Sequence, residues 1–191
     1  ARRQRQMCIR DRENIAEYLI YMWHIEDVIR ANNLDIDHIK QSLVDTRTDL
    51  NDEQKKQLVE WYESLIDMMR REDVVKSGHL QLNKNIISAL VALHNALLKD
   101  PRFPEYTKEF YATLPIIVEL RAKSGEDKKG EIETCFNALY GMLMLRLAGK
   151  EISPETAAAI KQISKFIALL AHYFKRDEEE DLFKNDESTA S

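Results

Sequence analysis

Glycine and proline are scarce in this chain of 191 residues, which has five glycines and four prolines. These residues form many of the turns that connect β-strands, and an all-β fold needs such turns at short intervals. Their scarcity therefore argues against an all-β fold. Hydrophobic residues make up 44% of the chain, which is enough for a sizeable buried core. The length fits a single domain.

Cysteine is rarer still, with only Cys8 and Cys135, and neither belongs to a Cys-x-x-Cys pair. Zinc sites and redox dithiols need closely spaced thiols, so we expect no metal and no cofactor. The absence of a disulfide framework favours a reducing compartment. The longest uncharged apolar run, over residues 86–98, is too short to cross a bilayer, and the chain opens with no secretory signal pattern. These features predict a cytoplasmic protein that does not bind a membrane.

Outside residues 1–12, the chain has no pronounced cluster of basic residues. Five of the arginines fall within that first segment. That segment resembles a translated sequencing adapter, and we interpret it as a non-native leader. Without it, residues 13–191 carry 23 bases and 32 acids, a net charge of −9. We therefore expect no nucleic-acid partner. Residues 176–191 hold seven acids and two bases and predict a disordered acidic tail, which leaves residues 13–175 as the helical domain.

Apolar residues recur with helical spacing through that domain and predict an all-α, single-domain bundle of about six to seven helices. Asn51 with Gln54 forms a capping-box pattern, and Ser153 followed by Pro154 marks another helix start. Pro115 lies inside a predicted helix and should kink it. The predicted helices span about 14–32, 35–43, 51–71, 82–99, 105–123, 132–147 and 154–174.

Several short stretches together resemble an uncharacterised, all-α bacterial family known only as a domain of unknown function. The resemblance spans about residues 14–175 and implies a helical fold without implying an activity. The stretches that carry it are Asn14–Leu19, Tyr21–Trp23, Glu26–Asp27, Glu60–Glu63, Met68–Arg71, Gly78–Leu80, Phe103–Tyr106, Leu114–Lys123 and Gly130–Phe136.

Two charged residues lie on predicted apolar faces: Glu26 in the first helix and Arg146 in the sixth. A buried charge is costly unless it is paired, so we predict either that the two meet as a structural ion pair or that Arg146 extends to solvent at the rim of the core. The functional alternative is that both form the polar floor of a ligand pocket.

Other candidate site residues are weaker. His94 falls on the apolar stripe of its helix, where a hydrogen-bonded core histidine is the more frequent arrangement. The acids Glu60, Glu63 and Asp67 lie opposite their helix's apolar stripe and predict a solvated face rather than a metal site.

Two functions are compatible with this pattern. The first is a non-enzymatic interaction or ligand-binding domain, with a homo-oligomer, a protein partner or a small molecule left open. Its candidate ligand-binding residues are Glu26, Arg146, His94, Glu119, Arg121 and Glu131. The alternative is a metal- or nucleotide-dependent hydrolase of an unfamiliar all-α type. In it the carboxylates of Glu26, Glu119 and Glu131 would gather metal ions, and Arg121 or Arg146 would bind phosphate. Whether the chain is an enzyme is left open.

Overall fold

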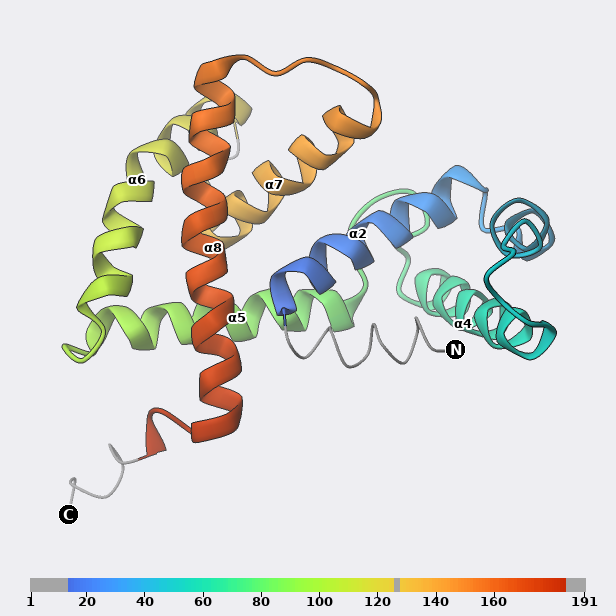
Figure 1. Cartoon of the computed structure of the whole chain (residues 1–191), viewed down its shortest axis with the longest axis horizontal. Helices are drawn as coiled ribbons and strands as arrows, with labels where there is room; N and C mark the ends of the chain where they lie inside the picture. Colours follow the sequence, from blue (N-terminus) through green and yellow to red (C-terminus); the bar gives the residue numbers. More distant parts are fainter. Residues whose placement is uncertain (1–13, 126–127, 185–191) are drawn as a thin grey trace. The chain divides into compact units, whose positions relative to one another are not determined.

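The structure, a computed structural model, describes residues 14–125 and 128–184, and in these ranges it consists of helices and their connectors, with no strand (Figure 1). The predicted all-α bundle is confirmed. The helices of the described residues are α2 (Ile15–Ala31), α3 (Ile36–Ile39), the π-helix η1 (Lys40–Val44), α4 (Asp52–Arg71), α5 (Gln81–Lys99), α6 (Pro104–Ser124), α7 (Glu131–Leu147) and α8 (Pro154–Glu180).

Contacts between residues group the chain into two compact units. The first unit comprises Glu17–Asn85 and contains most of α2, all of α3, η1 and α4, and the first turn of α5. Its core is formed by aliphatic residues from each of these helices together with Tyr62. The second unit comprises residues 86–184 with Asn14–Ala16, and in it α6, α7 and α8 pack against one another.

The helix-start signals in the sequence are confirmed. The Asn51 side chain accepts a hydrogen bond from the backbone N–H of Gln54, and the Gln54 side chain accepts one from the N–H of Asn51. The Ser153 hydroxyl accepts a hydrogen bond from the N–H of Thr156, with Pro154 at the first position of α8. Around Pro115, α6 continues as one helix, so this proline does not divide it.

The predicted end of the last helix near Phe174 is wrong, because α8 continues to Glu180. Arg176 accounts for the difference: its guanidinium lies 3.1 Å from the Glu180 carboxylate and over the Tyr173 ring. Asp181, with a φ of 53°, ends the helix. An ion pair between side chains four residues apart therefore stabilises the helix beyond residue 176, where the acidic composition predicted a disordered tail.

Two further predictions concern residues that lie partly or wholly outside the described ranges. The leader at residues 1–12 lies wholly outside them. Of the predicted acidic tail, residues 185–191 lie outside, while the carbonyl of Leu182 accepts a hydrogen bond from Arg102. In the part of the chain that the structure describes, no helix is both long enough and apolar enough to cross a membrane.

Candidate functional site

The side chain of Glu26 is the most deeply buried charge in the first unit, with 1% of it exposed. It lies on the apolar face of α2, between Met22 and Ile29, as the sequence predicts. One carboxylate oxygen, Oε2, accepts a hydrogen bond of 2.8 Å from the backbone N–H of Leu80. The other, Oε1, lies 3.0 Å from Nδ1 of His79. Both oxygens are therefore satisfied, which a buried carboxylate requires.

The His79 ring is held on two sides. Its face stacks on the indole of Trp23, with ring centroids 4.3 Å apart and an angle of 12° between the planes. Its Nδ1 faces a carboxylate oxygen, which can only accept, so Nδ1 carries the proton. About a third of the side chain stays exposed to solvent. In the neutral ring, Nε2 is therefore the nitrogen with the free electron pair.

The connector, residues 72–80, carries His79 from α4 to α5 and is fixed to α2 by a second residue, Arg30. The Arg30 guanidinium donates hydrogen bonds to the carbonyl of Val74, at 3.0 and 3.3 Å, and to the carbonyl of Gly78. Gly78 has a φ of 91°, in the left-handed region that favours glycine. The turn before His79 is thus set by its backbone and by Arg30 together.

Carboxylates also cap the start of α5. Glu26 accepts the N–H of Leu80, and Glu72 accepts the N–H of Gln81 at 2.9 Å. The first backbone N–H groups of a helix have no partner inside it, and a negative charge there is favourable. Glu26 therefore satisfies the start of α5 and orients His79 at the same time.

Glu26 has its partners within the first unit, and no contact with Arg146 is among those of the described residues. Both oxygens of Glu26 have other partners, and the side chain of Arg146 is exposed near the end of α7. Its neighbours Leu145 and Leu147 are also exposed. The apolar composition of this turn suggested burial that the fold does not provide.

His94 is a hydrogen-bonded core histidine, the arrangement that its place on an apolar stripe favoured. Its Nδ1 lies 2.5 Å from the hydroxyl of Tyr106, and the rings of Phe110 and Phe166 meet it edge-on. Burial lowers the pKa of His94, and the Glu131 carboxylate offsets part of that effect. The ring therefore resists protonation in the folded protein.

The remaining candidates of the second unit form ordinary surface pairs. Glu119 is exposed beside Lys123 on α6, at 2.7 Å, and Arg121 lies 3.6 Å from Glu131 across α6 and α7. Nearby Cys135 is fully buried, and burial raises the pKa of its thiol to about 12, so it stays protonated. Within residues 14–125 and 128–184, no three acidic, histidine or cysteine side chains gather as a metal site would need.

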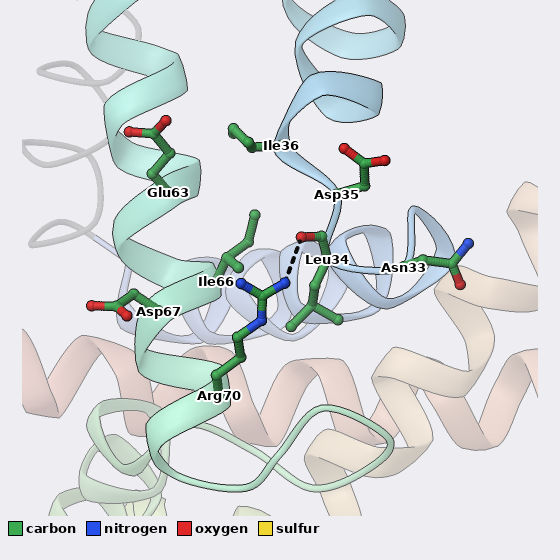
Figure 2. A pocket seen from close by; sticks show the side chains of 8 residues that line it. All are labelled: Asn33, Leu34, Asp35, Ile36, Glu63, Ile66, Asp67 and Arg70. Carbon is green, nitrogen blue, oxygen red and sulfur yellow. Dashed lines mark hydrogen bonds between the residues drawn. The ribbon is translucent and has the colours of Figure 1, made fainter.

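A hollow of about 460 Å³ opens elsewhere in the first unit, between the turn after α2 and the exposed side of α4 (Figure 2). Its rim carries carboxylates, its wall is aliphatic, and one guanidinium lies beside it. The residues that line it are Asn33, Leu34, Asp35, Ile36, Glu63, Ile66, Asp67 and Arg70. Glu63 and Asp67 are exposed, as predicted for this face of α4.

The turn at the hollow has an unusual backbone. Asn33 and Leu34 are consecutive residues with a φ of 56°, a conformation that costs a bulky side chain free energy. Arg70 stabilises the turn by donating a hydrogen bond of 3.3 Å to the Leu34 carbonyl, drawn in Figure 2. Leu34 itself is buried, which compensates for the strained backbone.

Sequence reasoning missed His79 and Trp23 as partners of Glu26. The available signal was Gly78 directly before His79, at the break between two helices. That break places a histidine at a helix start, where a buried carboxylate is favourable. The distance of 53 residues between Glu26 and His79 hid the pairing.

We predict that Glu26→Ala lowers the free energy of unfolding by about 2–4 kcal/mol, because it leaves a buried N–H of Leu80 without a partner. Arg146→Ala should change it by less than about 0.5 kcal/mol, since the side chain is exposed. Chemical denaturation of the two single variants and the double variant measures both values. Additive losses are expected for Glu26 with Arg146, and a coupling between them would show that the two side chains interact.

We also predict that acid destabilises the protein partly through His94. Its pKa is lowered in the folded state from the usual 6.5, so the unfolded chain takes up a proton that the folded chain refuses. Stability should therefore fall as the pH drops through about 6.5, until His94 protonates in the folded state too. Denaturation at several pH values should show a flatter slope for His94→Asn than for the wild type. An unchanged slope would contradict this assignment.

Comparison with known proteins places the chain in a family. A search of curated proteins and a search of solved structures both gave no match. Residues 8–181 match the family described as "Domain of unknown function (DUF4924)", which confirms the resemblance expected over residues 14–175. The chain, an all-helical protein, belongs to this family of unknown function.

Proposed function

We propose that the protein is a non-enzymatic binding domain whose hollow beside α4 takes a small organic cation with an aliphatic portion. The observation that supports this most directly is the composition of the hollow, which combines carboxylates with an aliphatic wall. Its volume of about 460 Å³ lies within the range of small-molecule sites.

The charges of the lining favour a positive ligand. The lining contains three carboxylates, those of Asp35, Glu63 and Asp67, and one guanidinium, that of Arg70. Arg70 is already hydrogen-bonded to a backbone carbonyl, and Asp67 is paired with Arg71 outside the hollow. Glu63 keeps its charge exposed on the rim, where it would attract an ammonium group.

The aliphatic side chains of the hollow favour a ligand that also has an apolar portion. Ile66 and Leu34 are buried beneath the hollow, and Ile36 is partly buried at its edge. An alkyl chain that contacts these side chains loses apolar surface to water, at about 25 cal/mol per Å². An alkylammonium or alkyldiamine therefore fits the hollow better than an inorganic cation does.

The hydrolase alternative has less support. It needed Glu26, Glu119 and Glu131 as metal-binding carboxylates, and each of them has a different partner. A cytoplasmic location, the absence of a nucleic-acid or membrane partner and the oligomeric state stay predictions from the sequence. The buried, free Cys135 supports a reducing compartment.

We expect 1,5-diaminopentane to raise the melting temperature of the full chain, because a ligand that binds only the folded state stabilises it. Glu63→Gln should weaken this effect, since it removes one rim charge and keeps the shape of the side chain. Titration calorimetry gives the affinities, and a loss of about fivefold is expected from one charge pair worth about 1 kcal/mol.

The matched control is Glu60→Gln, one turn earlier on α4, where an equally exposed carboxylate does not line this hollow. It should bind the diamine as the wild type does. Equal losses in both variants would show general attraction to an acidic surface, and no binding to the wild type would refute the proposed site.

A further inference from the structure

We infer that His79 is a nucleophilic histidine whose Nε2 accepts a phosphoryl group from a phosphoramidate or acyl-phosphate donor. This inference is independent of the hollow and its cation, because it rests on a different set of residues. Three observations support it: a buried carboxylate on one ring nitrogen, a stacked indole, and partial exposure of the imidazole.

Glu26 determines which nitrogen can react. In a free imidazole the proton exchanges between the two nitrogens, and either can be the nucleophile. Here the carboxylate of Glu26 accepts the proton of Nδ1 and holds the ring in one tautomer. In the neutral ring the electron pair is then on Nε2, and solvent reaches this side chain. A base that orients and activates a nucleophile in this way is the common arrangement in covalent catalysis.

The same two neighbours stabilise the product. With phosphoramidate, the Nε2 electron pair attacks phosphorus, the donor's P–N bond breaks, and ammonia leaves with that bond's electrons. The proton of Nδ1 stays in place, so the phosphorylated ring is a cation. Glu26 lies 3.0 Å from that nitrogen, and Trp23 presents its aromatic face to the ring. Ion pairing and a cation–π contact both favour the charged ring over the neutral one.

The backbone around His79 fixes the position of its ring. Leu80 precedes the first residue of α5, so His79 lies at the positive end of that helix. Arg30 holds the carbonyl of Gly78, directly before His79. His79 therefore lies in a turn whose backbone is fixed on both sides.

His38 provides an internal control. It is more exposed than His79, and its ring has no carboxylate partner in the described structure. If exposure alone governed the reaction, phosphoramidate would modify His38 first. We expect His79 to react about tenfold faster, because its nucleophile is held in the reactive tautomer.

Incubation of the full chain with potassium phosphoramidate, followed by peptide mass spectrometry under alkaline conditions, measures both rates. The matched variant is Glu26→Gln. Its amide can accept the N–H of Leu80 while its NH₂ group donates to Nδ1 of His79, which moves the ring proton to Nε2. This variant should keep its fold by circular dichroism and lower the rate at His79 to that of His38. His79→Asn should abolish labelling at this position.

Phosphorus NMR of the labelled protein identifies the modified nitrogen. A signal for Nε2-phosphohistidine that is lost in His79→Asn supports the inference. Equal rates at His79 and His38 in the wild type would overturn it, and so would modification of Nδ1 or an unchanged rate in folded Glu26→Gln. Because the wild-type comparison needs no variant, the inference is tested even if Glu26→Gln fails to fold.

Discussion

The carboxylate of Glu26 is the constraint on which the first unit depends. A charge with 1% of its side chain exposed is stable only if every lone pair that faces the protein has a donor. The fold meets this requirement with a backbone N–H from Leu80 and a ring nitrogen from His79. The connector must therefore return to α2 with one particular register, since a shift of one residue would leave the carboxylate unpaired.

This one interaction links the fold to the candidate chemistry. By accepting the N–H of Leu80, Glu26 caps a helix, and by accepting the Nδ1 proton of His79 it selects a tautomer. Trp23, three residues before Glu26 on α2, supplies the aromatic face. The buried carboxylate that stabilises the start of α5 thus also orients the nucleophile, and no second buried charge is needed for this.

Much of the fold could be predicted from the sequence because it depends on local patterns. The capping box of Asn51 and Gln54 and the start of α8 at Ser153 are encoded within four residues. The end of α8 could not be predicted in the same way. There, Arg176 pairs with Glu180 inside a strongly acidic segment, and a count of charges does not reveal individual pairs.

The candidate site shows the limit of such reasoning more clearly. Burial of Glu26 follows from helical periodicity alone, and the structure confirms it. Its partner is a matter of tertiary contacts, and periodicity favoured Arg146 because that residue also lies in an apolar segment. The true partner, His79, sits in a connector without periodicity, and only the three-dimensional path of the chain brings it to α2.

Hydrogen–deuterium exchange at the amide of Leu80 tests this account most directly. The wild type should protect this amide strongly, because it donates to a buried carboxylate. In Glu26→Ala, protection should fall at Leu80 and along residues 74–82, while amides in the middle of α6 keep theirs. Equal protection of Leu80 in the two proteins would show that the carboxylate does not hold the connector, and would contradict the account.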